Sequence, residues 1–132
     1  MYLCNQIIKT MALSEQEQIR REKLNELLQM GINPYPAEKF EVNSKSTYIL
    51  ENFEQAEARF GAGKEEISIA GRILSVRDMG KAAFAQIQDA EGKIQIYIKR
   101  DEICRGDDKT MYDTVWKKLI DIGDIIGIKG YV

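Results

Sequence analysis

Two short stretches of the chain alternate between apolar and polar residues, and this alternation constrains the fold more than any other feature. Every second residue is apolar in residues 82–89 and again in residues 93–100. The sequence Asp89-Ala90-Glu91-Gly92 between them is typical of a tight hairpin turn. Pairing around this turn gathers six apolar residues on one face: Ala83, Ala85, Ile87, Ile94, Ile96 and Ile98. A slip of one residue would mix the two faces, so the register is predicted together with the hairpin.

Two further strands are expected on either side of this hairpin. The first begins near residue 66, where the apolar residues start to recur with a period of two, and the last runs from Ile125 to Val132. Gly71 interrupts the first strand, and a glycine in a strand often marks a bulge or a sharp bend. The apolar set of the first strand is Ile67, Ile69 and Ile73.

Three helices are expected outside the strands. Ser14 and Glu17 form the capping box typical of a helix start, and Gly31 is placed to end that helix. A second helix is expected from about Thr47 to Phe60 and a third over residues 111–122, because apolar residues recur there at helical spacing. Their apolar faces are Ile49, Phe53, Ala56 and Phe60 in the second helix, and Tyr112, Val115, Trp116, Leu119 and Ile120 in the third.

Three strands, a helix and a fourth strand match most of the OB fold, a five-stranded Greek-key barrel. The predicted class is therefore mainly β with helices: an OB-fold barrel whose fifth strand is missing from this chain, preceded by an N-terminal helical extension. The alternative is a small open meander with helices on one face. We expect three parts. Residues 1–13 form an N-terminal extension that is expected to be disordered, residues 14–64 form a helical segment, and residues 65–132 form the truncated barrel.

The composition removes several classes of function. None of the 132 residues is a histidine, so the commonest general base and the commonest zinc ligand are missing, and we expect neither a catalytic nor a metal site. Cys4 and Cys104 have no close spacing and suit a reducing cytoplasm. No apolar run approaches the roughly 18 residues of a membrane span. A cytoplasmic protein without a membrane partner is expected.

The polar face of the predicted hairpin carries an aromatic residue. Phe84 falls on this face, opposite Tyr97 and diagonal to Gln95. A phenylalanine there predicts a platform on which an unpaired base stacks, and Gln95 offers both a donor and an acceptor to the edge of that base. The alternative is that another part of the chain, such as the second helix, covers Phe84.

Basic residues are concentrated around this aromatic residue. The net charge of the chain is -2, but residues 71–100 contain six Lys and Arg against three Asp and Glu. Arg77, Lys81 and Arg72 are expected near the loop at residues 78–80, where the first two strands meet. OB folds bind single strands through such a combination of strand face and loop.

The stretch from Ala70 to Tyr97 resembles the anticodon-binding barrel of class II aspartyl-, asparaginyl- and lysyl-tRNA synthetases. In that group a phenylalanine stacks on the central anticodon base, a glutamine eleven residues later reads its edge, and an arginine seven residues earlier assists. Phe84, Gln95 and Arg77 stand at the matching positions. The N-terminal stretch Arg20–Pro36 is similar to lysyl-tRNA synthetases specifically.

The resemblance implies an anticodon-binding module of a lysine–tRNA ligase, with the anticodon loop of lysine tRNA as its partner. ATP, Mg²⁺ and the ligation reaction would belong to a catalytic domain outside this sequence, so the chain alone is expected to be inactive. That domain is a second expected partner, and self-association through unpaired strand edges is a third. A general single-strand-binding barrel and a protein-interaction domain remain as alternatives.

Overall fold

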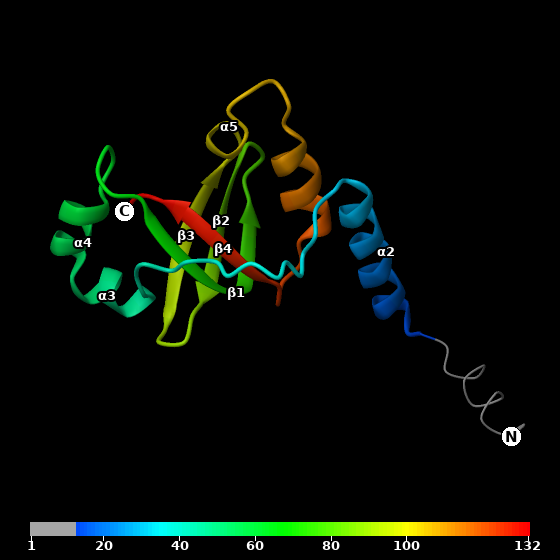
Figure 1. Ribbon diagram of the computed structural model, residues 1–132, viewed down its shortest axis with the longest axis horizontal. Coiled ribbons are helices and arrows are strands. Elements are labelled where there is room, and N and C mark those ends of the chain that lie inside the picture. Colours follow the sequence, from blue (N-terminus) through cyan, green and yellow to red (C-terminus); the bar gives the residue numbers. More distant parts are fainter. Residues whose placement is uncertain (1–12) are drawn as a thin grey trace, which may run out of the picture. The chain divides into compact units, whose positions relative to one another are not determined.

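The computed structural model describes residues 13–132 (Figure 1). The extension expected at residues 1–13 lies, except for Leu13, outside the described residues. Contacts among the described residues divide them into two units, with the boundary between Pro36 and Ala37. The helical segment expected at residues 14–64 is therefore divided between them. Among the described residues, no helix has the length and apolar character needed to cross a membrane.

The first unit contains the helix α2, Glu15–Gln29. The predicted capping box is confirmed: the Glu17 amide donates to Ser14 Oγ at 3.3 Å, and the Ser14 amide donates to Glu17 Oε2 at 2.8 Å. The helix ends before Gly31, whose φ of 79° is a left-handed conformation that glycine adopts without strain. No residue of α2 is buried.

The second unit is built on a four-stranded antiparallel sheet in the order β3-β2-β1-β4. The strands are β1 (Ile67–Asp78), β2 (Ala82–Gln88), β3 (Lys93–Lys99) and β4 (Ile125–Gly130). The long strand β1 pairs with β4 through residues 67–72 and with β2 through residues 72–78. Because each half of β1 has a different partner, the sheet curls into a half-barrel (Figure 1).

This strand order decides between the two predicted architectures. In an open meander β4 would lie beside β3, whereas here it lies beside β1. The OB-fold class is confirmed, and no fifth strand is seen among the described residues. The predicted hairpin register is also confirmed, since Ala83 pairs with Ile98, Ala85 with Ile96 and Ile87 with Ile94.

The expected second helix is divided into α3, Ser46–Glu51, and α4, Phe53–Phe60. Asn52 separates them with a non-helical backbone (φ -123°, ψ 49°). The prediction that Phe53 belongs to the apolar face is wrong: Phe53 is the first residue of the new helix and is 55% exposed. The other three predicted residues, Ile49, Ala56 and Phe60, are buried.

A short helix, α5 (Arg100–Ile103), and the π-helix η1 (Met111–Leu119) connect β3 to β4. The wide turn of η1 is visible in the hydrogen bond from the Ile120 amide to the Val115 carbonyl, five residues back, at 3.0 Å. Of the five residues predicted on the apolar face of this helix, Ile120 is partly buried. The other four are buried: Tyr112, Val115, Trp116 and Leu119. Tyr112 and Trp116 pack with Phe60 of α4 and the inward residues of the sheet in one core.

The turn of the β2–β3 hairpin is tied to the start of α3 through Asp89. The carboxylate of Asp89 accepts bonds from the Ser46 amide and hydroxyl, both at 2.7 Å, and from the amides of Glu91 and Gly92, both at 2.9 Å. Partial burial disfavours the charged carboxylate, but these bonds outweigh it and lower the pKa of Asp89 to about 2. Because the folded pKa lies below the ordinary value, the stabilisation is present above about pH 4 and is lost as the pH falls toward 2.

The segment before α3 covers a free edge of the sheet. The Asn43 amide donates to the Ser68 carbonyl at 3.0 Å, and the Ser68 amide donates to Asn43 Oδ1 at 2.8 Å. At this point β1 has β4 on one side, while β2 begins to pair only at Arg72. The segment thereby satisfies backbone groups that would otherwise remain open to pairing with another chain.

Gly71 provides a test of the packing between β1 and β2. A Cβ atom there would lie 2.7 Å from the Gln88 carbonyl oxygen, whereas a Cβ at Gly130 would meet nothing within 4 Å. We expect Gly71→Ala to lower the free energy of unfolding by about 1–3 kcal/mol, because the backbone must move apart. Gly130→Ala, the control in β4, should change it far less. Denaturant unfolding measures both, and equal effects would contradict this reason for the glycine.

Candidate nucleic-acid interface

One extra residue in β1 determines which side chains share a face of the sheet. Ile73 pairs with Ile87 and Ser75 with Gln86, so Leu74 is a bulged residue without a partner on β2. In a regular strand Ile73 and Arg77 would face the same side. The bulge reverses the alternation, and Arg77 therefore pairs with Phe84 on the polar face of β2. Gly71, where a bulge or bend was expected, instead permits the close approach of Gln88.

The register defines three cross-strand rows on this surface, which we call the polar face. The rows are Arg77, Phe84 and Tyr97; Ser75, Gln86 and Gln95; and Arg72, Gln88 and Lys93. Lys99 follows Tyr97 on the same side of β3, opposite Ala82. The charged residues at these strand positions are all basic: Arg72, Arg77, Lys93 and Lys99.

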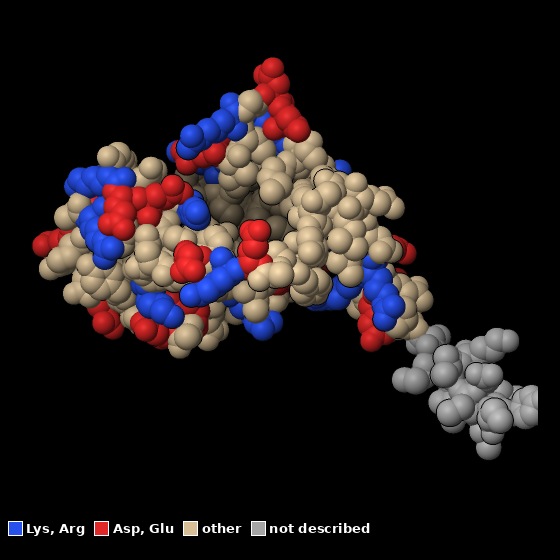
Figure 2. Space-filling model, in the orientation of Figure 1, with Lys and Arg blue, Asp and Glu red and all other residues tan. Residues whose placement is uncertain are grey.

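Basic charge is thus gathered locally in a chain of net charge -2. Elsewhere the two signs are mixed: on the surface drawn in Figure 2, blue and red side chains alternate over α3 and α4. The polar face is therefore the electrostatic candidate for binding an anion such as a phosphate backbone.

The aromatic residues of the first row stack on each other. The centres of the Phe84 and Tyr97 rings lie 4.7 Å apart, and the ring planes differ by 24°. Phe84 is half-buried and Tyr97 is 52% exposed, and neither belongs to the hydrophobic core. Among the described residues, the aromatic ring that stacks on Phe84 is that of Tyr97. This arrangement leaves an aromatic surface in solvent, as a stacking platform requires.

Polar side chains around Phe84 have unused hydrogen-bonding capacity. Among the described residues, Arg77, Gln95 and Gln86 form no side-chain hydrogen bond, and Arg77 forms no ion pair. All three are exposed. Glutamine amides both donate and accept, and a guanidinium donates up to five hydrogens. These groups can therefore bind a polar ligand without breaking contacts of the fold.

Arg72 differs from the other predicted residues. We expected it near the loop with Arg77 and Lys81, but its partner Gln88 lies at the opposite end of β2, beside the hairpin turn. Its Nη1 donates to the Gly123 carbonyl at 2.9 Å, which fastens β1 to the turn before β4. That expectation of its place was wrong, because residues 72–78 span the whole length of β2. Its predicted role in binding stays a prediction.

The loop that precedes β2 is held at several points. The Gly80 amide donates to Asp78 Oδ1 at 2.8 Å, and the Tyr112 hydroxyl donates to the Gly80 carbonyl at 3.2 Å. Lys117 of η1 forms an ion pair with Asp78 at 3.5 Å. Lys81 at the end of this loop is exposed and lies three residues before Phe84. The loop thus places a lysine close to the aromatic row.

Ser75 and Lys93 also lie on the polar face and are not among the predicted site residues. The hairpin register already placed Lys93 opposite Gln88, so the sequence contained a signal for it. Ser75 could not be assigned, because its face depends on the bulge at Leu74.

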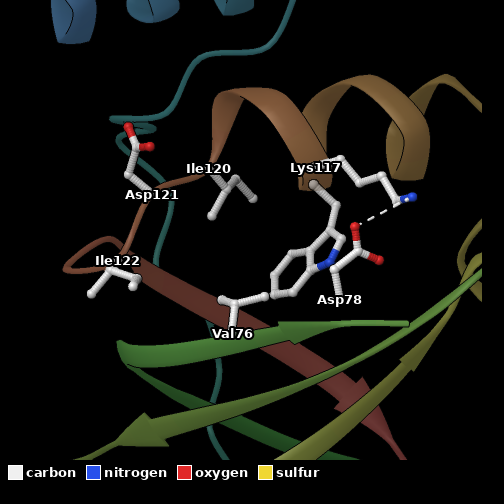
Figure 3. Close-up of a pocket in the computed structure, with 7 residues that line it drawn as sticks. Val76, Asp78, Lys117, Ile120, Asp121 and Ile122 are labelled. Carbon is white, nitrogen blue, oxygen red and sulfur yellow. Dashed lines mark ion pairs between the residues drawn. The ribbon is translucent and has the colours of Figure 1, made fainter. Parts of the chain in front are cut away.

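A small surface pocket of about 210 Å³ lies on the other side of the sheet (Figure 3). It is lined by Val76, Asp78, Trp116, Lys117, Ile120, Asp121 and Ile122. Val76 and Asp78 pair with Ala85 and Ala83, which face the core. The pocket therefore opens away from Phe84 and is not part of the polar face.

Comparison with known proteins agrees with the fold. Residues 67–132, half of the chain, match the family of OB-fold nucleic acid binding domains. The chain belongs to this family of nucleic-acid-binding barrels. Its resemblance to the N-terminal anticodon-binding part of lysyl-tRNA synthetases is confirmed by long, close matches to such enzymes.

The matches are to bacterial lysine–tRNA ligases. The chain is 58% identical over 120 residues to the lysine–tRNA ligase of Porphyromonas gingivalis and 53% identical over 118 residues to that of Christiangramia forsetii. It is 49% identical over 120 residues to that of Azobacteroides pseudotrichonymphae. These alignments cover 91%, 89% and 91% of this chain, but 20%, 19% and 23% of the relatives. The chain thus spans about a fifth of the length of the curated relatives it matches.

Proposed function

We propose that this chain is the anticodon-binding module of a lysine–tRNA ligase and recognises the anticodon loop of lysine tRNA. The observation that carries the proposal is the first row of the polar face. Phe84, half-buried, lies there between Tyr97, which stacks on it, and Arg77, and Gln95 is diagonal to it. The side chains of Arg77 and Gln95 have no hydrogen bond within the described part of the chain. Loops expose unpaired bases, the form of RNA in which sequence is most readily read.

In the proposed mechanism, the central anticodon base stacks on the ring of Phe84. Stacking holds any base, since every base has a π-face, and it therefore supplies affinity rather than selectivity. Gln95 supplies selectivity by donating to and accepting from the edge of the base. Arg77 assists from the neighbouring strand, and Tyr97 supports the aromatic surface.

Lysines and arginines of the polar face attract the phosphates. Lys81, exposed at the end of the loop, is the basic residue nearest in sequence to Phe84. Phosphate contacts fix the position of the RNA but do not read its sequence. Arg72 contributes positive charge at the far end of β2 while its hydrogen bond to Gly123 holds the sheet together.

Ligation itself we assign to parts of the parent protein outside this chain. Those parts would bind ATP and Mg²⁺ and join lysine to the tRNA, and the catalytic domain would be a partner of this module. We propose a cytoplasmic location, because translation takes place there. Self-association through the edges of β3 and β4 also remains a proposal. A general single-strand-binding barrel and a protein-interaction domain are the rivals that the following tests separate.

The first test removes the stacking platform. Phe84→Ala should weaken binding of a lysine anticodon stem-loop by about 1–3 kcal/mol, because one base loses its aromatic partner. The free energy of unfolding should fall by about 0.5–1.5 kcal/mol for the lost aromatic pair, and further only by the value of the buried part of the ring. Isothermal titration and denaturant unfolding measure the two quantities.

Phe53→Ala is the control, because Phe53 is an exposed phenylalanine on α4, outside the sheet. It should leave RNA binding unchanged. If both variants bind the stem-loop as tightly as the parent chain, the polar face is not the binding surface and the proposal fails.

The second test separates reading of the base from attraction to phosphates. Gln95→Ala should reduce the preference for the lysine loop over a loop with a changed central base. Lys81→Ala should weaken both loops equally and reduce the salt dependence of binding, because fewer counterions are released. Fluorescence anisotropy at several salt concentrations provides both quantities.

Gln55→Ala and Lys64→Ala are controls at exposed positions outside the sheet. If Gln95→Ala leaves the preference intact, the base is not read by Gln95. Equal binding of both loops and of single-stranded DNA by the parent chain would favour the general single-strand-binding barrel.

A further inference from the structure

We propose that Tyr97 is a positioning residue that acts through Phe84. It holds the Phe84 ring by stacking on one of its faces, so that an RNA base can reach only the opposite face, on the side of Arg77. This inference rests on the proposed function and specifies where on the polar face the base lies.

The first step in the argument is the order of the strands. β2 lies between β3 and β1, and Phe84 pairs with Tyr97 on one side and with Arg77 on the other. The rings of Phe84 and Tyr97 are 4.7 Å apart between centres and 24° from parallel. A base has no room between two rings at this spacing. The face of Phe84 that is turned toward β3 is therefore closed.

The second step concerns the faces of Tyr97. One face carries Phe84, and the ammonium group of Lys99 lies over the ring, 5.4 Å from its centre. Since the space between the rings is filled, this ammonium lies over the other face. Lys99 is also held by an ion pair with Glu102 at 3.2 Å. Tyr97 is thus the more exposed ring of the pair, with Phe84 on one face and the Lys99 ammonium over the other.

The third step concerns the remaining face of Phe84. Arg77 is its neighbour there, and the guanidinium of Arg77 has no hydrogen bond or ion pair with any described residue. A guanidinium plane stacks on bases and aromatic rings. The Arg77 side chain can therefore move to admit a base and then stack on it. The base would lie between Phe84 and Arg77, which gives Arg77 a role in stacking as well as in attraction.

A double-mutant cycle on the whole chain tests this placement. The variants are Tyr97→Leu, Phe84→Ala, the double variant and Tyr97→Phe, and the probe is a lysine anticodon stem-loop. Tyr97→Leu alone should weaken binding roughly two- to tenfold, because Phe84 loses its aromatic support. In the Phe84→Ala background the same change should have no effect. Tyr97→Phe, which keeps the ring, should bind within about twofold of the parent chain.

The outcomes separate the inference from the function on which it rests. If Phe84→Ala does not weaken binding, the proposed function fails. If Phe84→Ala weakens binding but Tyr97→Leu has the same effect in both backgrounds, Tyr97 contacts the RNA itself and only the inference fails. No effect of Tyr97→Leu in the parent chain would also overturn the inference.

A second measurement does not depend on how the variants fold. In the complex of the unmodified chain with the stem-loop, nuclear Overhauser effects should connect the protons of one loop base to the Phe84 ring and to the Arg77 side chain. Contacts from that base to the face of the Tyr97 ring would contradict the placement.

Discussion

The bulge at Leu74 is the constraint on which the rest of the site depends. Strict alternation from Ile73 would turn Arg77 toward the core, where an unpaired guanidinium is too costly to bury. The extra residue reverses the alternation halfway along β1. The first half of the strand thereby keeps Ile67, Ile69 and Ile73 buried, while the second half presents Arg77 beside Phe84. One strand thus serves both the core and the polar face.

Helices on the opposite side of the sheet, together with contacts at both ends of β2, fix the position of the polar face. Phe60, Tyr112 and Trp116 fill the concave side of the sheet, so the helices that carry them leave the polar face free. Asp89 fastens the hairpin turn to α3, and Tyr112 fastens the loop before β2. Both ends of β2 are therefore anchored. A platform on an anchored strand loses little conformational entropy when a ligand binds, which favours affinity.

The sequence predicted the structure correctly where a single pattern was enough to determine the pairing of strands. The register of β2 and β3 followed from two apolar alternations separated by a short turn, and it placed Phe84, Gln95 and Tyr97 on one face. The bulge was not predicted, although the apolar positions change phase from Ile73 to Leu74 and Val76; the shift in pairing appears only when β1 pairs with β2. Asn52 breaks a helix whose apolar spacing continues across the break, which misplaced Phe53. The bond from Arg72 to Gly123 joins residues 51 positions apart, beyond any local pattern.

The central claim is that the loop of a lysine tRNA binds on the polar face and not on the opposite side of the sheet. Side-chain N–H signals in nuclear magnetic resonance spectra report on the two sides separately during a titration with the anticodon stem-loop. The account predicts large shifts for Arg77 Nε–H and the Gln95 amide, with little change for the indole N–H of Trp116, which lines the pocket behind the sheet. A shifted Trp116 indole with unchanged Arg77 and Gln95 signals would contradict it.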